Sequence, residues 1–468
     1  MIGHVIIIGG GIAGLATAYY LQRQSEFSIT YTLVESGRQF GGKIVTEQTD
    51  GLTIEGGPDS FIMLKPWAND LCADLRLQDR LIGSQEQNRQ TYVLQKNCLR
   101  PLPDGFALLV PTRLMPFITS PLFSPWGKLR MALDWVLPAA ADNGDVSVGE
   151  FVSRRLGREA VEKIAEPLLA GIYGADPDCL SLRTTFPRFL HMEQKYGSLI
   201  KAALANRRRA AANGERPPLF MALRGGMYEL VDALVKALRG TLITGDGVAR
   251  IQYDPAARKR FQVHLGSGRC LAADAIVMAT PAFVAAELLA PLNSALAERL
   301  RAIRYHSSAT VSLAYAKAKV NHKLAGYGFV VPKREECRLL ACSWVSSKFA
   351  DRAPTEKVLL RAFLGGYRNE ELLDFPDEHL IRLVRDEFKQ VMNIDAAPDL
   401  ERVYRWPKGN VQYDVGHQER IDAIEKLAEK SCVGLHFAGC AYRGGGIPNC
   451  IYWGRKTAER VVEEARNG

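Results

Sequence analysis

The chain has 468 residues and a formal net charge of +9 at pH 7, and 47% of its residues are hydrophobic. These values are typical of a globular protein with two or three domains. They exclude membrane-spanning helices, because apolar runs such as Val5–Ile8 are far shorter than the roughly 20 residues that cross a bilayer. Basic residues are scattered apart from Arg207–Arg209, so we expect no nucleic-acid partner; an acidic substrate or an anionic membrane surface fits the charge.

Cysteine usage and the first residues indicate a reducing compartment. The chain has nine cysteines, an odd number, and no C-x-x-C pair, which predicts free thiols and neither a zinc nor an iron–sulfur site. Val5–Ile8 lacks a basic leader and a cleavage site, and glycines follow at once. It is therefore expected to be a strand rather than a signal peptide, in a cytoplasmic protein without a bound metal.

The first 35 residues predict one compact β-α-β unit. Residues 4–8 and 29–34 have the apolar runs of buried strands, and residues 15–22 have the apolar periodicity of a helix. Gly9–Gly14 joins the first strand to the helix, and Glu35 closes the second strand.

The middle of the chain is less regular. Prolines recur among apolar clusters between residues 102 and 141. Ser147, with Glu150 three positions later, has the spacing of a capping box and predicts a helix over 147–170. The polar segment 207–218 is rich in helix breakers and is predicted to be a mobile loop.

The combination of strands, glycine turns and helices predicted for the first 35 residues returns in the second half of the chain. A helix is predicted after Arg224, followed by a turn at Gly245–Gly247 and a strand that begins at Val248. Residues 275–279 predict another buried strand. Residues 435–465 repeat the order of strand, glycine loop and helix.

The Gly9–Gly14 segment has the glycine spacing of a dinucleotide loop. Gly9 permits the tight turn, Gly11 lets the backbone approach a pyrophosphate, and Gly14 lets the helix pack on the strand. The positive end of the helix faces the phosphates. Glu35 follows Gly14 by 21 residues, close to the usual spacing of about 20, and can accept hydrogen bonds from the ribose hydroxyls.

Two other loops favour FAD over NAD. A basic glycine loop at 37–43 can meet the pyrophosphate from the other side. A second glycine loop, at 444–448, precedes the C-terminal helix. Because this second helix N-terminus arrives from the far end of the chain, it suits a long, permanently held cofactor.

Several short motifs then resemble, in the same order, those of the oxygen-dependent protoporphyrinogen and coproporphyrinogen oxidases, within the amine-oxidase-like flavoproteins. The segments that carry this resemblance are Gly56–Phe61, Glu166–Tyr173, Asp176–Ser181, Phe186–Pro187, Gln412–His417 and Gly446–Ile451. With the loop at Gly9–Gly14, the resemblance extends from residue 4 to about residue 460.

The resemblance implies an FAD site drawn from separate parts of the chain. Its members would be Gly9, Gly10, Gly11, Ile12, Ala13, Gly14, Glu35, Ser36, Gly42, Lys43, Gly57, Pro58, Asp59, Ser60, Val248, Trp406, Gly446, Ile447 and Pro448. Val248 would meet the adenine through its backbone. Trp406 fits a core aromatic equally well.

The implied reaction is the six-electron oxidation of protoporphyrinogen IX to protoporphyrin IX in haem biosynthesis, with coproporphyrinogen III as the alternative substrate. FAD accepts two electrons in each of three rounds, and O₂ reoxidises it with release of hydrogen peroxide. The hard chemistry belongs to the cofactor, so we expect no catalytic side-chain triad. His417 and His436 are the histidines expected nearest the cofactor, although a structural role fits each better.

Substrate contacts follow from the same resemblance. The positions that pack on the macrocycle correspond to Val330 and Phe363, which also fit an ordinary strand core. Gly171 corresponds to a place where the backbone faces the substrate. Arg89 corresponds to the arginine that binds a propionate in some members, which favours protoporphyrinogen IX, although a solvated surface arginine is the alternative.

The expected fold class is α/β: a Rossmann-type FAD-binding domain, a mixed α/β substrate domain and a helical cap subdomain. The FAD-binding domain would be assembled from residues 1–85, 221–300 and 406–468. The cap would take residues 86–220, and the substrate domain residues 301–405.

The cap segment carries aromatic and basic residues that fit two interpretations. Phe123 and Trp126, with Arg113, Lys128 and Arg130, suit a surface that rests on a membrane, as in some relatives implied by the resemblance. An ordinary helical core is the alternative. A peripheral membrane location, delivery of product to a ferrochelatase, and a monomeric or homodimeric state are further expectations.

Two competing functions stay open at this point. One is another flavoprotein of the superfamily, an amine oxidase or a carotenoid desaturase, which would not predict the G-P-D-S-F segment at 57–61. The other is a non-enzymatic flavin-bearing or haem-pathway scaffold, which needs no reactivity with O₂.

Overall fold

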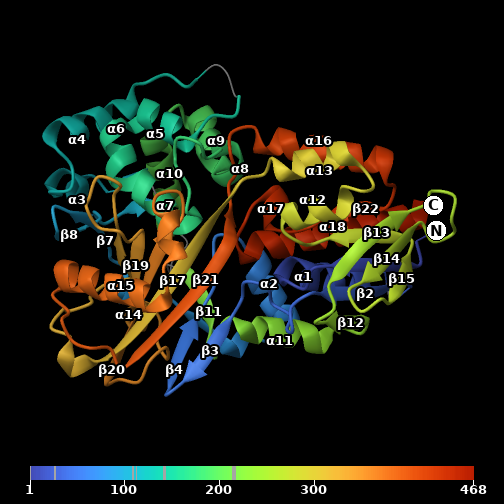
Figure 1. Ribbon diagram of the computed structural model, residues 1–468. Helices are drawn as coiled ribbons and strands as arrows, with labels where there is room; N and C mark the ends of the chain where they lie inside the picture. Colours follow the sequence, from blue (N-terminus) through green and yellow to red (C-terminus); the bar gives the residue numbers. More distant parts are fainter. Residues whose placement is uncertain are drawn as a thin grey trace.

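The computed structural model describes residues 2–25, 28–107, 110–111, 113–140, 144–212 and 218–467. Within this part of the chain, a five-stranded β-sheet, a seven-stranded β-sheet, four smaller sheets and a group of helices make up the molecule (Figure 1). The N- and C-termini lie at the same end, beside the five-stranded sheet (Figure 1). The α/β class predicted from sequence is confirmed.

The first sheet has five strands, and they pair in parallel. Parallel neighbours need crossover connections, and in such sheets helices cover both faces. In spatial order the strands are β12 (Thr241–Thr244), β2 (Thr30–Glu35), β1 (His4–Ile8), β16 (Ala275–Met278) and β22 (Leu435–Phe437). Val5 and Ile7 face the core under α1 (Ile12–Gln24) and α18 (Ile447–Asn467). Ile6 and Ile8 face the opposite core, which includes α12 (Ala282–Leu289). The predicted N-terminal β-α-β unit is therefore confirmed.

The second sheet has seven strands, antiparallel except where β18 meets β7. In spatial order they are β21 (Leu400–Val411), β17 (Tyr305–Ala316), β20 (Lys357–Gly365), β19 (Ala341–Trp344), β18 (Gly328–Val330), β7 (Thr91–Gln95) and β8 (Cys98–Pro101). One face packs on α15 (Asp377–Met392). β21 runs across residues 405 and 406, where the sequence places a domain boundary, because Leu400–Trp406 pair with β17 without interruption.

Helices from the middle of the chain gather at one end of the seven-stranded sheet, the upper left in Figure 1. We call them the helical subdomain: α3 (Leu114–Thr119), α4 (Pro125–Ala132), η3 (Leu133–Trp135), α5 (Val148–Leu156), α6 (Arg158–Ala160), the π-helical η4 (Val161–Ala165), α7 (Glu166–Tyr173), α8 (Leu182–Thr185), α9 (Pro187–Tyr196) and α10 (Leu199–Ala212).

Two predictions in this region need correction. Ser147 does cap α5, accepting a hydrogen bond from the Glu150 backbone N–H at 3.0 Å. The helix predicted over 147–170 is broken at Gly157, whose φ of +91° no α-helix accommodates, and helical structure resumes to reach Tyr173. The loop predicted over 207–218 is wrong up to residue 212, because α10 continues through the arginine run; residues 213–217 lie outside the described part.

The remaining elements connect these layers. They are α2 (Trp67–Asp74), α11 (Tyr228–Ala237), α13 (Ser294–Arg301), α14 (Val345–Lys348), α16 (His417–Ser431), α17 (Cys440–Arg443), β3 (Thr46–Thr49), β4 (Leu52–Glu55), β5 (Phe61–Ile62), β6 (Leu81–Gly83), β9 (Phe106–Ala107), β10 (Val110–Pro111), β11 (Phe220–Leu223), β13 (Val248–Tyr253), β14 (Phe261–Leu265), β15 (Cys270–Ala273), η1 (Gln78–Arg80), η2 (Glu86–Asn88), η5 (Lys317–Lys319) and η6 (Glu370–Asp374).

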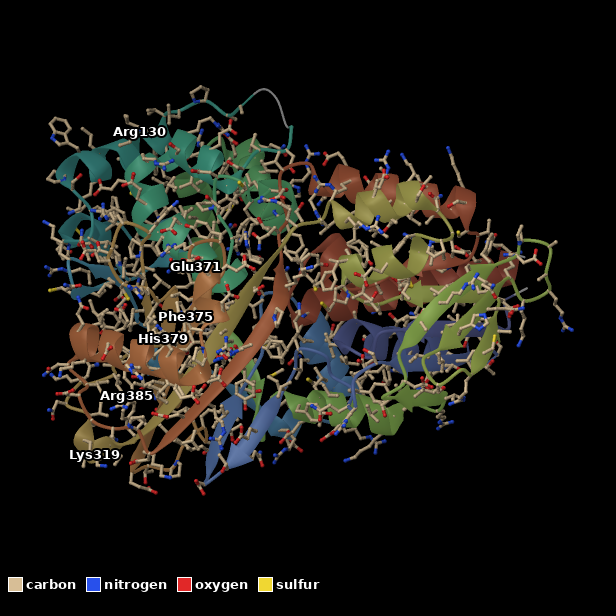
Figure 2. All side chains as sticks on the ribbon, in the orientation of Figure 1. Arg130, Lys319, Glu371, Phe375, His379 and Arg385 are labelled. Carbon is tan, nitrogen blue, oxygen red and sulfur yellow. The ribbon has the colours of Figure 1, made fainter. Side chains whose placement is uncertain are left out.

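Side chains fill the space between the layers, from Arg130 in the helical subdomain to Lys319 at the far end of the seven-stranded sheet (Figure 2). No helix in the described ranges is both long enough and apolar enough to cross a membrane.

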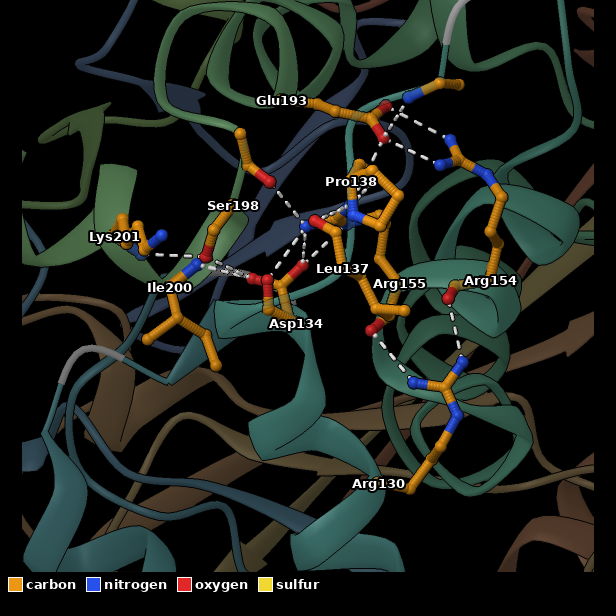
Figure 3. Close-up of polar contacts among 12 residues, drawn as sticks. Arg130, Asp134, Leu137, Pro138, Arg154, Arg155, Glu193, Ser198, Ile200 and Lys201 are labelled. Carbon is orange, nitrogen blue, oxygen red and sulfur yellow. Dashed lines mark hydrogen bonds and ion pairs between the residues drawn. The ribbon is translucent and has the colours of Figure 1, made fainter.

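The helical subdomain is organised around a buried ion pair (Figure 3). Arg155 and Asp134 are both fully buried, and the Arg155 Nε donates to Asp134 Oδ1 at 2.6 Å. The same guanidinium donates to the Gly197 carbonyl at 2.8 Å, and Asp134 accepts from Ser198 Oγ at 2.6 Å. Because each charge satisfies groups on other elements, the pair joins α5 and η3 to the start of α10.

We predict that Arg155→Met lowers the free energy of unfolding by about 3–5 kcal/mol, because it leaves the Asp134 carboxylate buried without its partner. Denaturant unfolding followed by circular dichroism measures this change. Arg158→Met is the matched control on the neighbouring α6, where the side chain is 62% exposed, and should change stability by less than about 1 kcal/mol. Equal effects of the two substitutions would contradict the assignment.

Candidate functional site

The turn after β1 is shaped by contacts that only glycine allows. Gly9 has a φ of +109°, and its N–H donates to the Val34 carbonyl at 2.8 Å. A Cβ atom on Gly14 would lie 1.9 Å from the Gly9 carbonyl oxygen. By contrast, no protein atom lies within 4 Å of the position that a Gly11 Cβ would take. Gly9 and Gly14 therefore serve the packing of the chain, while Gly11 keeps a surface open in front of α1.

The carboxylate of Glu35 is fixed by the backbone around it. Its Oε2 accepts from the Gly10 N–H and its Oε1 from the Gly37 N–H, both at 2.7 Å. Ser36 lies beside the turn before β13, since a Cβ on Gly247 would be 2.9 Å from its Cβ. Glu35 pairs with Thr244 at the end of the adjacent β12, and the chain turns there to begin β13 at Val248, so the structure brings the predicted residues Glu35, Ser36 and Val248 to one region.

The basic glycine loop and the G-P-D-S-F segment meet at the same place. Gly42 lies against Gly11, with its Cβ position 3.1 Å from the Gly11 Cα. A Cβ on Gly57 would lie 1.7 Å from the Lys43 carbonyl oxygen and 3.6 Å from the Trp406 ring. The Trp406 Nε1 donates to the Gly56 carbonyl at 2.9 Å. Trp406 is therefore a partly exposed neighbour of the predicted flavin segment rather than a member of the described hydrophobic cores.

The C-terminal glycine loop closes the arrangement. Gly446 precedes α18, and no protein atom lies within 4 Å of its Cβ position. Gly454 packs so tightly on α1 that its Cβ would lie 2.8 Å from the Ala13 carbonyl oxygen. A Cβ on Gly439 would lie 3.9 Å from the Ala13 Cβ. The N-terminus of α1, which begins with Ile12 and Ala13, therefore packs on α18 at Gly454, seven residues after Ile447 begins that helix and six after Pro448. Both helix N-termini carry partial positive charge.

A buried charge cluster beneath Gly56–Ser60 was not predicted from sequence. Lys348 Nζ lies 2.9 Å from an Asp59 carboxylate oxygen, and Ser60 Oγ donates to Asp59 at 2.7 Å. Arg361 donates to the Gly57 carbonyl at 2.6 Å and to the Gly56 carbonyl at 3.0 Å. Burial alone would raise the pKa of Asp59, but Lys348 and Arg361 hold it well below its usual range.

A signal for part of this cluster was present in the sequence. Arg361 is the charged residue in the otherwise apolar run Val358–Leu364 of β20, and a buried arginine of this kind needs partners. Its partners on Gly56 and Gly57 lie about 300 positions away, at separations of 305 and 304 residues. Only the folded chain could identify them.

Three of the four predicted substrate residues lie together. Val330, Ala341 and Phe363 are directly opposite one another on β18, β19 and β20, so their side chains share a face of the sheet. A Cβ on Gly171 would lie 3.3 Å from the Ala341 Cβ and 3.9 Å from Val330 Cγ1. Gly171 thus allows α7 to approach the sheet, a packing reason that sequence reasoning did not supply.

Phe363 connects this face to the predicted flavin segment. The Arg361 guanidinium carbon lies 4.9 Å from the centre of the Phe363 ring, and the same guanidinium bonds to Gly57. Phe363 is partly exposed, whereas Val330 is buried. The apolar row and the flavin segment are therefore neighbours.

Arg89 lies apart from that row. Its guanidinium forms an ion pair with Glu86 at 3.0 Å on η2, and 43% of its side chain is exposed. Among the described residues no hydrogen bond or ion pair links it to Gly171, Val330 or Phe363. Binding of a propionate by Arg89 stays a prediction, and it would require competition with Glu86.

Neither of the two histidines has the geometry of a catalytic base. His417 is fully buried, its Nε2 bonds to the Tyr442 carbonyl at 2.9 Å, and burial lowers its pKa to about 4. His436 lies on β22 with its Nε2 3.2 Å from a Glu464 oxygen. Both act structurally in this arrangement.

Comparison with known proteins identifies the family. Residues 12–462 match the flavin containing amine oxidoreductases. The chain belongs to this family. It is 36% identical to coproporphyrinogen III oxidase of Bacillus subtilis over 97% of this chain and 96% of that one. It is 26% identical to protoporphyrinogen oxidase 2 of Arabidopsis thaliana over 98% of this chain and 93% of that one.

A solved structure gives the same result for the fold. A crystal structure from Exiguobacterium sp. 255-15, named a "putative protoporphyrinogen oxidase", superposes with a TM-score of 0.87 at 30% identity and covers 99% of both chains. The chain is thus an enzyme of a flavin oxidoreductase family, and the prediction of an FAD cofactor is confirmed.

The residues present fit such a cofactor. The open positions at Gly11 and Gly446 each lie at the N-terminus of a helix, α1 and α18, and a helix N-terminus suits a phosphate group. Glu35 stands at the strand end where a ribose would lie, and Lys43 and Gly57 flank the next part of the cradle. The individual contacts predicted for Gly10, Gly42, Pro58, Asp59 and Ser60 stay predictions.

We predict opposite consequences for two substitutions in the first loop. Gly11→Val should abolish flavin retention without lowering the thermal midpoint of the flavin-free protein, because no protein atom opposes its side chain. Gly14→Val should lower that midpoint or prevent folding, because its Cβ would overlap the Gly9 carbonyl. Flavin absorbance per protein and differential scanning fluorimetry measure the two effects. A purified Gly11→Val variant that is still fully yellow would show that the loop does not face the cofactor.

Proposed function

We propose that this protein is an FAD-dependent porphyrinogen oxidase of haem biosynthesis that uses O₂ and releases hydrogen peroxide. The observation that carries the proposal is the apolar row Val330–Ala341–Phe363, which Arg361 joins directly to the predicted flavin segment at Gly57. A flat apolar face beside a flavin suits a large macrocycle. The names of the relatives agree with this substrate class.

Coproporphyrinogen III is the proposed substrate, with coproporphyrin III as the product. The similarity to the Bacillus subtilis coproporphyrinogen III oxidase exceeds that to the Arabidopsis protoporphyrinogen oxidase by 10 percentage points, 36% against 26%. The sequence argument for protoporphyrinogen IX depended on Arg89, which Glu86 engages in this fold. Protoporphyrinogen IX is the second candidate, supported by the correspondence of Arg89.

The protein contributes binding, orientation and exclusion of water. The flavin supplies a two-electron acceptor that O₂ regenerates, so three rounds remove the six electrons. The row at Val330 and Phe363 would hold the macrocycle by its apolar faces, and Arg361 would fix the Gly56–Gly57 backbone against that row. No described side chain needs to act as a general base.

The helical subdomain presents an apolar surface, and we propose that it rests on a membrane as a cap over the substrate site. Trp126 is 79% exposed and Val136 is 72% exposed. Other exposed apolar side chains on the same elements are Met115, Ile118, Leu129, Leu133 and Trp135. Lys128 of α4 would meet anionic headgroups. Arg130, which the sequence assigns to the same role, instead donates to the backbone carbonyls of Ser153, Arg154 and Arg155. Delivery of product to a ferrochelatase and the oligomeric state stay predictions of the sequence.

The sequence expectation that Phe123 belongs to this surface is wrong. Phe123 is only 3% exposed, because its ring packs between Phe106 at 6.1 Å and Phe117 at 5.6 Å. Residues 102–141 therefore contribute side chains both to a helical core and to an exposed apolar surface. Residues 108, 109, 112 and 141 of this segment lie outside the described part.

The proposed reaction predicts that anaerobic coproporphyrinogen III bleaches the flavin absorbance of the holoenzyme, and that air then restores it with release of peroxide. The kcat/KM should be higher for coproporphyrinogen III than for protoporphyrinogen IX. Stopped-flow absorbance and a peroxide assay follow the steps. A flavin that stays oxidised with both porphyrinogens would refute the function, and a preference for protoporphyrinogen IX would select the second candidate.

The membrane proposal predicts that the double variant Trp126→Ser, Val136→Ser binds anionic phospholipid vesicles roughly tenfold or more weakly than the wild type, because burying each side chain contributes about 1.5–3 kcal/mol. Co-sedimentation with vesicles measures the partition. Val433→Ser is the control, since Val433 is 49% exposed but precedes β22 at the far end of the molecule. Unchanged partitioning of the double variant would remove the membrane role.

A further inference from the structure

Arg188, in the first turn of α9, is a cation without an acidic partner among the described residues. No hydrogen-bond acceptor or carboxylate contacts its guanidinium, which lies 5.1 Å from the centre of the Phe189 ring. Neighbouring arginines behave differently. Arg183 pairs with Glu419 at 2.9 Å, and Arg154 pairs with Glu193 at 2.7 Å. Arg188 therefore has its donors available for a ligand.

The Arg188 side chain is exposed to solvent. Protein surrounds it closely enough that burial lowers the pKa of the guanidinium, while the nearby Tyr173 of α7 acts in the opposite direction. Tyr173 follows Ile172, which is 57% exposed, and Gly171, which packs on Ala341 of the predicted substrate row.

A chain of ring contacts connects this neighbourhood to the C-terminal glycine loop. Phe186, two residues before Arg188, packs edge-to-face on Tyr173 at 6.0 Å. Tyr173 packs edge-to-face on Tyr413 at 6.2 Å. The Tyr413 hydroxyl would lie 2.6 Å from a Cβ on Gly445. Three aromatic rings, those of Phe186, Tyr173 and Tyr413, therefore link the start of α9, which carries Arg188, to the loop predicted to hold the flavin.

Lys65 approaches from the other side of that loop. Its Nζ donates to Asn449 Oδ1 at 2.8 Å, and Asn449 in turn donates to the Gly445 carbonyl at 2.9 Å. Asn449 is neutral, so the Lys65 charge also lacks a carboxylate partner among the described residues. Burial lowers the pKa of Lys65, and the positive charge of Arg188 lowers it further. The two cations thus lie close enough to repel each other, and an anion bound near both would relieve that repulsion.

We propose that Arg188, with Lys65 beside it, binds a propionate carboxylate of the porphyrinogen. The proposal rests on the proposed function and names the substrate group that the site selects. A guanidinium binds a carboxylate through two parallel hydrogen bonds, and partial desolvation strengthens them. Coproporphyrinogen III carries four carboxylate arms and protoporphyrinogen IX carries two. A cation at this position therefore favours the tetracarboxylate when one of the additional arms reaches it.

The test compares Arg188→Gln with Lys195→Gln, which removes one charge from an exposed position on the same helix. Arg188→Gln should raise KM for coproporphyrinogen III about tenfold and change kcat less than about twofold, because a charge-assisted hydrogen bond held equally in ground and transition states is lost. The rise should be smaller for protoporphyrinogen IX. Arg188→Lys should recover part of the loss, and Lys195→Gln should match the wild type.

A binding measurement separates this role from a purely structural one. Titration of the holoenzyme with coproporphyrin III and with its tetramethyl ester, in the same dilute non-ionic detergent, gives the contribution of the carboxylates. The wild type should prefer the acid about tenfold, and Arg188→Gln should lose that preference while keeping its flavin content and thermal midpoint. If Arg188→Gln is unstable, the same loss is read from Arg188→Met, and partial recovery from Arg188→Lys.

The outcomes distinguish this inference from the proposed function. A wild type that oxidises coproporphyrinogen III, with Arg188 variants of unchanged KM and unchanged preference for the acid, overturns the role of Arg188 and leaves the function standing. A wild type that oxidises neither porphyrinogen fails the proposed function itself.

Discussion

The structure depends on the close packing of α1 between the end of β1 and α18. The Gly9 carbonyl oxygen occupies the place of a Gly14 side chain, and the Ala13 carbonyl stands 2.8 Å from the place of a Gly454 side chain. These two contacts fix the N-terminus of α1 against the end of β1 and against α18, a helix from the opposite end of the chain. The N-termini of both helices carry partial positive charge, and Gly11 and Gly446 leave the surface open beside them. The cofactor site is therefore a result of backbone packing more than of side-chain chemistry.

Buried charges join the other parts of the molecule to that point. Arg361 of the seven-stranded sheet bonds to the carbonyls of Gly56 and Gly57, and Lys348 pairs with Asp59. These contacts fix the distance between the flavin segment and the face that carries Phe363. A buried ion pair is a weak source of stability, but its geometric requirements are strict. These charges fix the Gly56–Ser60 segment against the seven-stranded sheet and the helix that follows its strand β19.

The helical subdomain is also held together by buried charges, and its outer elements carry exposed apolar side chains. Arg155 and Asp134 hold its helices together from within, so its outer elements can present Trp126 and Val136 to solvent without losing their positions. Its inner side carries Gly171 against the sheet and Arg188 near Tyr173. One subdomain therefore faces both the apolar row and the exterior, which is the arrangement that an enzyme acting on an apolar, carboxylated macrocycle requires.

The sequence by itself determined the local chemistry of this protein. The glycine spacing from Gly9 to Gly14, Glu35 at the end of the next strand and the repeat of the pattern near Gly446 were enough to predict an FAD-binding β-α-β unit, because each piece depends on a few neighbouring residues. The chain-wide motifs predicted the family, which the comparison confirmed. Short-range signals were sufficient wherever the backbone alone makes the site.

Only the tertiary structure decided which side chains meet. Phe123 and Trp126 have similar sequence surroundings, yet one is buried and the other exposed, because burial depends on distant rings such as Phe106. Asp59 finds Lys348 across 289 residues, and Arg188 lacks a carboxylate that Arg183, five positions earlier, obtains from Glu419. Such pairings are long-range consequences of packing. A pattern of neighbouring residues in the sequence does not predict these pairings.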